Sequence, residues 1–446
     1  MKNTKDMTIG SLKKSILMFS IPLIFSHLLQ VLFNMADIAV VGRFGGASAL
    51  GSVGSTTTAV VLFTGFLIGI GSGVNALTAL YLGAKSDENV EKCVHTSLIV
   101  SLLFGIFIML FGIIISRPLL LLLNTKEELL DGAVLYFKIY FLSMPAVSLY
   151  NFGNGVFSAA GDTKKPLAFL SIAGIINVLL NLFFVICLNM TVEGVALASV
   201  ISQYISATLV IISLFKSKEN FSLSVKKLRF DRETAKRVLA LGVPSGCQNA
   251  IFQLANLFIQ AGVNSFDATF VSGNSAAANA DAIIYNIMNA FYVACTSFMG
   301  QNYGAKKRDR VIKSFYTSLA YSFLAGLIPG AILFFFGKSF LFLFTTDAAV
   351  VAAGLKRVNV MAFSYCVSSF MDCTIAASRG LGRTFVPTII VILGSCVFRV
   401  IWVYTIFAHF HTIESLYLLY VFSWSITAIA EIMYFVKIWK KDPVNA

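Results

Sequence analysis

Apolar segments recur along nearly the whole chain, and this pattern limits the possible folds more than any other feature. A helix that crosses a membrane needs about 20 mainly apolar residues, and many of these segments are that long. Of the 446 residues, 57% are hydrophobic and only 12% are charged, whereas an ordinary soluble domain has about 25% charged residues. No remaining stretch is long enough for a separate soluble catalytic domain. The sequence therefore predicts an all-α polytopic membrane protein.

Charged residues and Gly/Pro-rich breaks divide the apolar sequence into twelve transmembrane helices. The predicted spans are residues 15–39, 53–81, 94–116, 132–159, 167–187, 194–215, 238–262, 276–302, 314–337, 356–378, 386–408 and 415–437. The longest break with basic residues separates spans six and seven. We therefore expect an N-terminal six-helix lobe at residues 1–215, a cytoplasmic basic linker at 216–237 and a C-terminal six-helix lobe at 238–446.

The distribution of basic residues predicts the orientation in the membrane. Alternate loops place 26 of the 34 Lys and Arg on the side of the N-terminus and one, Arg399, within a span. Cytoplasmic loops of membrane proteins carry the excess of Lys and Arg, so we expect both termini to be cytoplasmic, in a plasma (inner) membrane. The net charge of +13 then reflects topology and contact with membrane lipid, and no nucleic-acid partner. The other seven Lys and Arg are assigned to the side opposite the termini, and they are Arg43, Arg117, Lys126, Lys138, Lys338, Lys356 and Arg357.

The two halves of the chain are copies of one another. When positions 83–98 are aligned with 304–319, eight of the sixteen places agree, and the same alignment puts Gly161, Thr163 and Pro166 on Gly382, Thr384 and Pro387. Because six helices is an even number, both copies enter the membrane in the same sense. The pseudo-two-fold axis then runs along the membrane normal, and substrate is expected between the halves near mid-membrane.

Among the acids inside predicted spans, where ionisable residues are costly and usually functional, two stand out. Asp37 follows Pro22 by about four helical turns, which places the acid and the proline kink on one broad face of the first helix. No Lys or Arg within the spans of that half offers Asp37 a partner. Asp372 has two open interpretations, because it could form a structural ion pair with Arg399 of the next span or serve transport.

Amide side chains recur at helical spacing along several spans, so each set occupies one helix face. Such amides can simply hydrogen-bond neighbouring helices. Together with Asp37, however, Asn151, Asn177 and Asn181 would supply one acid and several oxygens within one half, as a proton or sodium site needs. The sets are Asn151 with Asn154, Asn177 with Asn181, Gln253 with Asn256 and Gln260, and Asn286 with Asn289.

No motif for nucleotide, metal or nucleophilic chemistry is present. The sequence has no Walker motif, no HExxH and no GxSxG elbow, so neither ATP-driven transport by this chain alone nor an intramembrane hydrolase is supported. We expect no enzyme activity, no cofactor and no metal centre, apart from Na+ at Asp37. The energy for transport would come from an ion gradient.

Four motifs in order resemble the multidrug and toxic compound extrusion (MATE) family of antiporters, of the bacterial type, within the MOP flippase superfamily. The resemblance runs from about Leu12 to Lys437. The motifs are Asn34-Met-Ala-Asp37 with Val41-Gly42-Arg43, then Ala159-Ala160-Gly161-Asp162-Thr163-Lys164-Lys165-Pro166, then Gly300-Gln301-Asn302-Tyr303-Gly304-Ala305, and Arg379-Gly380-Leu381-Gly382-Arg383-Thr384 with Pro387.

The resemblance implies a V-shaped pair of six-helix lobes that exports small organic cations in exchange for H+ or Na+, and we expect a monomer. It assigns ion coupling to an acid of helix one with a proline hinge about four turns before it, which are Asp37 and Pro22 here. The other polar positions matched near that acid are Asn151, Asn154, Asn177, Asn181 and Ser199.

The chain departs from the family pattern at two of its polar positions. Some members have an acid where Asn181 falls, and many have a Glu where Gln253 falls. In the second lobe the corresponding polar set is Gln253, Asn256, Asp372 and Arg399.

Two other functions remain open. A flippase for lipid-linked oligosaccharides belongs to the same superfamily, but it should place several Lys or Arg in its cavity to bind pyrophosphate, and the spans here offer only Arg399. A membrane-embedded enzyme would need clustered His and acidic residues at mid-membrane, whereas the four histidines are scattered. The sequence therefore favours the exporter.

Overall fold

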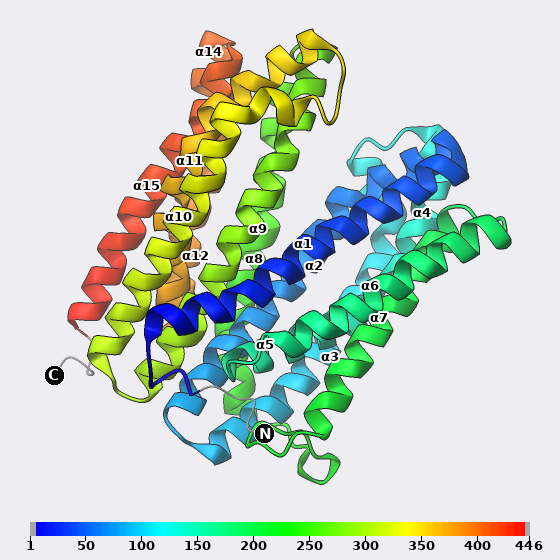
Figure 1. Ribbon diagram of the computed structural model, residues 1–446. Coiled ribbons are helices and arrows are strands. Elements are labelled where there is room, and N and C mark those ends of the chain that lie inside the picture. The colour runs from blue at the N-terminus through cyan, green and yellow to red at the C-terminus, as the bar shows by residue number, and fades with distance from the viewer. Residues whose placement is uncertain (1–5, 442–446) are drawn as a thin grey trace. The chain divides into compact units, whose positions relative to one another are not determined.

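The protein is described by a computed structural model that covers residues 6–441, and every regular element in that range is a helix (Figure 1). This confirms the predicted all-α fold. The helices of the first half are α1 (Leu12–Val40), η1 (Val41–Gly45), α2 (Gly46–Gly83), α3 (Asp87–Leu122), α4 (Glu127–Phe141), α5 (Met144–Ala159), α6 (Lys164–Leu182), η2 (Phe183–Cys187) and α7 (Val192–Phe215). Those that follow are η3 (Val225–Lys227), α8 (Arg232–Val263), α9 (Ala268–Gly304), α10 (Arg308–Leu341), α11 (Ala348–Gly380), α12 (Phe385–Val391), η4 (Ile392–Val397), α13 (Phe398–Trp402), η5 (Val403–Phe407), α14 (Ala408–Phe410) and α15 (Ile413–Lys440).

The helices account for the twelve predicted spans. Ten of them are long and apolar enough to cross a membrane, and α4 with α5 makes an eleventh span that is bent by 46°. The twelfth is α8, which is 32 residues long but carries several amide side chains among its apolar residues. The twelve-helix arrangement of two bundles therefore fits the structure.

The described chain forms two compact units that exchange short segments. Unit 1 contains Phe25–Ala250 together with Asp6, and unit 2 contains Met7–Ile24 and the chain from Ile251 onward. Two helices, α1 and α8, therefore each belong to both units. In α1 the boundary between the units lies two residues after Pro22. Both boundaries, in α1 and in α8, fall outside the predicted linker at residues 216–237, and all of that linker belongs to unit 1.

The N-terminal segment of α1 packs within unit 2 against α9. The ring of Phe19 contacts that of Phe298 edge-on with centroids 5.6 Å apart, and Ser20 donates to the carbonyl of Ala290 at 3.5 Å. Before the helix begins, Lys307 and Arg310 donate to backbone carbonyls of residues 7–10. These contacts fix the start of α1 on the second half of the sequence.

The first part of α8 packs within unit 1 against α2, through glycines of two overlapping GxxxG motifs. A Cβ atom at Gly69 would lie 2.2 Å from the backbone nitrogen of Gly246, and one at Gly73 would lie 2.5 Å from that of Gly242. Small residues at such positions let helix backbones approach closely in membranes. The glycines of α2 are therefore required by its contact with α8.

The segment between α7 and α8 is held on the start of α3. The backbone N–H of Ser224 donates to Nε2 of His95 at 3.0 Å, and that of Asp231 donates to the hydroxyl of Thr96 at 3.1 Å. Lys227 forms an ion pair with Glu91 at 2.7 Å. The basic linker is therefore fixed by specific contacts to unit 1.

The backbone repeats the duplication seen in the sequence. Lys85 and Lys306, which occupy equivalent positions of the two copies, both have a positive φ, of 52° and 56°. Gly161 and Gly382 do the same at 81° and 75°, a conformation that glycine adopts without strain. The copies differ where α5 begins, because the bent pair α4 and α5 corresponds to the single long helix α11.

The contact of α2 with α8 can be tested by adding one methyl group. Gly69→Ala should lower the thermal stability of the purified protein, because overpacking costs about 1–3 kcal/mol. Gly54→Ala on the same helix is the matched control, since its Cβ would have no neighbour within 4 Å. Equal melting temperatures of the two variants in one detergent would contradict the packing described.

Candidate functional site

Asp37 lies near the end of α1, and its carboxylate accepts hydrogen bonds from two neighbouring helices of unit 1. The amide nitrogen of Asn181 on α6 donates to Oδ1 at 2.5 Å, and the hydroxyl of Ser199 on α7 donates to Oδ2 at 3.3 Å. The same Asn181 nitrogen also donates to Oδ1 of Asn177 at 3.3 Å. Four of the predicted site residues therefore form one connected cluster.

This cluster holds an acid without a basic partner. Asp37 is half-buried, and within residues 6–441 it forms no ion pair. Asn181 is 0% exposed, and its amide oxygen has no hydrogen-bond partner among the described residues. An unused oxygen beside a carboxylate is suited to a cation, because it can accept but not donate.

Short π-helical segments follow two residues of the cluster, Asp37 and Asn181, along the chain. The segment η1 begins four residues after Asp37, and η2 begins two residues after Asn181. Such segments interrupt the regular hydrogen bonds of a helix and are frequent at functional sites. The local backbone therefore supports the assignment of a site here.

The other two predicted amides of this half, Asn151 and Asn154, form no hydrogen bond with the carboxylate in the described chain. Asn151 donates to the carbonyl of Val147 in its own helix α5 at 2.9 Å, and its backbone lies against Gly71 of α2. Asn154 is half-buried on α5, and its amide oxygen has no partner among the described residues.

Tyr136 and Tyr140 of α4 interact electrostatically with Asp37, although the sequence did not indicate them. Their rings are stacked with centroids 5.8 Å apart. Their spacing of four residues is the signal that could have been noticed, but aromatic pairs at this spacing are common in helix cores.

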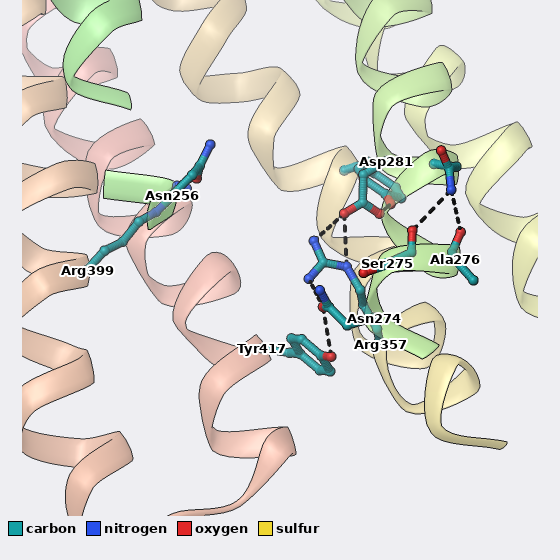
Figure 2. Close-up of polar contacts among 10 residues, drawn as sticks. Asn256, Asn274, Ser275, Ala276, Asp281, Arg357, Arg399 and Tyr417 are labelled. Atoms are coloured by element: carbon teal, nitrogen blue, oxygen red, sulfur yellow. Dashed lines mark hydrogen bonds and ion pairs between the residues drawn. The ribbon is translucent and has the colours of Figure 1, made fainter. Parts of the chain in front are cut away.

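In unit 2, Arg399 lies on α13 between the π-helical segments η4 and η5 and is 2% exposed. Its guanidinium donates to the hydroxyl of Ser423 at 3.2 Å and to the amide oxygen of Asn256 at 3.3 Å, and Figure 2 shows the latter contact. Three aromatic rings surround the cation, those of Phe252, Tyr420 and Trp424, at 4.9 to 5.8 Å from their centroids.

Asp372 does not form the ion pair with Arg399 that the sequence suggested as one interpretation. Across residues 6–441 the two side chains share no direct contact, and they interact only electrostatically at longer range. The guanidinium is stabilised instead by hydroxyl, amide and aromatic groups. Gln253 lies one turn before Asn256 on α8 and is half-buried.

A buried ion pair of unit 2 joins Arg357 of α11 to Asp281 of α9 (Figure 2). Arg357 also donates to the amide oxygen of Asn274 at 2.7 Å, as does the hydroxyl of Tyr417 at 3.0 Å. Tyr365 donates to the other oxygen of Asp281. This network connects α9, α11 and α15.

Arg357, which is counted among the seven basic residues on the side opposite the termini, is 6% exposed within α11. It falls at the start of the predicted span 356–378. A partner 76 positions away neutralises this charge, and such a partner is invisible in the local sequence.

The ion pair of Asp281 with Arg357 and the separated side chains of Asp372 and Arg399 predict different coupling energies in double-mutant cycles. Replacing Asp281 by Asn or Arg357 by Gln leaves a buried charge unpaired, which costs about 3–5 kcal/mol, whereas the double variant should recover much of this loss. The matched pair Asp372→Asn and Arg399→Gln should be additive to within about 0.5 kcal/mol, since the groups share no contact. Thermal unfolding of all six variants measures both coupling energies. A larger coupling between 372 and 399 than between 281 and 357 would contradict this description.

Comparison with known proteins places the chain in a family. The MatE family model matches residues 22–183 and 244–405, one match in each copy of the repeat. The chain is 30% identical over 362 residues to "Probable multidrug resistance protein YpnP" of Bacillus subtilis (strain 168), covering 81% of this chain and 80% of the relative.

Two solved structures share the fold, each at 22% sequence identity. One is described as MATE in the bent conformation, with a TM-score of 0.89 and coverage of 97% of this chain and 96% of the other. The second is described as MATE in the straight conformation, with a TM-score of 0.88 and coverage of 99% and 100%. With both repeats matched by the family model, the chain belongs to the MatE family, and it is a multi-pass membrane transporter rather than an enzyme.

Proposed function

We propose that this chain is a secondary active multidrug exporter, which moves small organic cations out of the cell in antiport with H+ or Na+ by alternating access. Its relative YpnP is named as a probable multidrug resistance protein. The observation that carries the proposal is the Asp37 cluster, in which a half-buried acid is held by amide and hydroxyl donors and has no basic partner in the described chain.

The cluster supports an exchange between a cation and the substrate. A carboxylate among apolar helices is costly in its charged form, so a bound proton, Na+ or organic cation would each stabilise it. If ion and substrate cannot be bound together, entry of the ion releases the drug outward. The membrane potential then contributes about 2.3 kcal/mol per charge per 100 mV to each inward movement of the ion.

Two amide oxygens beside Asp37 would contribute to binding of Na+ but are not needed for binding of H+. Oδ1 of Asn177 and the unpartnered oxygen of Asn181 could both face a metal cation, and side-chain oxygens are the groups that hard cations bind. Binding of a proton would need only the carboxylate. The cluster is therefore compatible with either ion, and Na+ would be the one that uses both amides.

The first helix supports a mechanical link to that exchange. Pro22 removes one hydrogen bond from α1 and its ring crowds the preceding turn, and α1 passes from unit 2 to unit 1 two residues later. Solved structures of MATE are described as bent and as straight. We infer that α1 alternates between two shapes about Pro22, since a transporter requires two discrete states.

The same proposal includes the setting of the protein. Both termini would be cytoplasmic, in the plasma membrane and in contact with its lipid, because the basic residues concentrate on that side. The chain would act as a monomer of two six-helix lobes, with the division expected between residues 215 and 238.

The flippase alternative is less well supported. A pyrophosphate lipid would require several unpaired cationic side chains. The buried Arg357 of α11 does not provide one, because its charge is neutralised by Asp281. The alternative of a membrane-embedded enzyme has no further support from the structure, because the described residues contain no cluster of three or more His, Cys, Asp or Glu that could hold a metal ion. The exporter therefore remains the function with the most support.

Removal of the charge at Asp37 tests the coupling. Asp37→Asn should preserve folding and much of the substrate affinity but abolish uptake of a fluorescent organic cation into inverted vesicles driven by imposed pH or Na+ gradients, because an amide cannot alternate between charged and neutral forms. Asp131→Asn is the matched control, since that side chain is 87% exposed. Near-normal transport by Asp37→Asn with both ions would dismiss Asp37 as the coupling acid.

Replacement of the proline tests the hinge. Pro22→Ala restores a backbone donor in α1 and should favour the straight form, so it should reduce the turnover number more than it weakens substrate binding. Both quantities can be measured in proteoliposomes and by equilibrium binding in detergent. Unchanged turnover would show that the proline is not a working hinge.

A further inference from the structure

Glu431 is a buried acid that the site at Asp37 does not involve. It lies on α15 in unit 2 and is 0% exposed. Neither of its carboxylate oxygens has a hydrogen-bond partner among the described residues. No other glutamate in the described chain is buried, so this one requires a separate explanation.

The surroundings of Glu431 are defined by two packed helices, α11 and α15. Met371 and Ile375 of α11 share an apolar cluster with Ala428 of α15, three residues before Glu431. Asp372 directly follows Met371 and is half-buried. The two acids therefore lie beside members of the same apolar cluster, one on α11 and one on α15, and they interact electrostatically.

A row of hydroxyl groups approaches Glu431 along the same face of α15. Ser423, Thr427 and Glu431 are spaced four residues apart, and all three are fully buried. The hydroxyl of Thr427 is hydrogen-bonded to that of Ser395 at 2.9 Å, and Ser423 accepts from Arg399. The polar row therefore leads from Arg399 to Glu431 through the interior of unit 2.

The charged neighbours of Glu431 act in opposite directions. Asp372 repels a second negative charge, while Arg379, two turns after Asp372 on α11, attracts one. Attraction at a distance does not replace the hydrogen bonds that an ionised carboxylate loses on burial. Glu431 interacts electrostatically with Asp372 and Arg379 of α11 and with Tyr434 of α15. Asp372 in turn interacts with Tyr285 and Tyr292 of α9, and Arg399 of α13 interacts with Cys396 of η4.

We propose that Glu431 is a proton-binding site inside unit 2, distinct from Asp37, and that Asp372 is the half-buried acid through which it exchanges its proton. The ligand is a proton rather than Na+, because a metal cation needs several oxygens around it, and the oxygens of Glu431 face no polar partner in the described chain. A neutral carboxylic acid is the form that so dry a position stabilises.

The site would make proton release depend on movement within unit 2. Ionised Glu431 would require water or a donor at oxygens that are now sealed, so the proton can leave only when α11 and α15 separate locally. This role in transport rests on the proposed antiport, whereas the protonation itself does not. A second proton would then accompany each conformational cycle in addition to the ion at Asp37.

Infrared spectroscopy of the intact protein tests the protonation directly. Wild-type protein at neutral pH should show a carbonyl band of a protonated carboxylic acid that shifts when glutamate, but not aspartate, is labelled with carboxyl-¹³C. Exposed glutamates are ionised under these conditions and do not contribute. The absence of any glutamate-sensitive band in the wild type would overturn the proposal, and this measurement needs no variant.

Two variants show whether the carbonyl band belongs to Glu431 and whether its protonated form is compatible with a stable fold. Glu431→Gln should remove it without a loss of thermal stability, because glutamine has the shape and charge of the protonated acid. Glu414→Gln on the exposed first turn of the same helix is the control and should retain it. A strong drop in melting temperature of Glu431→Gln with the band still present would identify an ionised, structural Glu431 and refute the site.

Proton counting separates this proposal from the proposed function. Substrate addition to wild-type protein in weakly buffered detergent should release more protons than addition to Glu431→Gln, and Asp37→Asn should still release the proton of Glu431. Equal release by wild type and Glu431→Gln would overturn the coupling role. If Asp37→Asn transported normally while the Glu431 band persisted, the proposed function would fail and the proton site would stand.

Discussion

A polar group inside a membrane has no water to bind, and this constraint decides both the fold and the position of each unusual residue. It restricts the backbone to helices, whose hydrogen bonds are internal. It also requires that each intramembrane charge find protein partners. Arg357 has a carboxylate, an amide and two aromatic rings. Asp37 has only an amide and a hydroxyl, and Glu431 has no hydrogen-bonding partner within the described residues. The number of hydrogen-bonding partners falls in that order, from the paired Arg357 to the two acids at which we propose that a cation is exchanged.

The fold could be predicted from the sequence because each helix is encoded locally. Segment length and the internal repeat give the number and pairing of the helices, and the motif around Asp37 predicts a candidate site. Long-range partners could not be predicted in the same way. A common site for Asp37 and Asn181 was expected from residue type and resemblance, but the pairing of Arg357 with Asp281 depends on how α11 packs on α9. Glu431 also lies inside a predicted span but was not singled out, because the local sequence does not show that its carboxylate is fully buried without a hydrogen-bond partner in the described chain.

The repeat preserves the backbone but not the chemistry. Turns at Lys85 and Lys306 and at Gly161 and Gly382 retain the same conformation. In the same alignment Asp372 falls on an asparagine, and Glu431 falls on a valine. The acids without an ion-pair partner in the described chain that are discussed above therefore lie on different helices in the two copies, on α1 in the first and on α11 and α15 in the second. Two similar frames have acquired unequal sites, as an asymmetric reaction cycle requires.

The exchanged segments of α1 and α8 have a consequence for biogenesis. During synthesis the chain up to Ile24 leaves the ribosome long before α9, the helix on which it packs. Unit 1 likewise lacks the glycine contact at Gly246 until the second half of the chain has started. Neither half can therefore complete its own packing while the other is missing, and the first helix stays without its partner α9 until the second half has been made. Cutting the gene between the repeats would yield two incomplete products rather than two ancestral bundles.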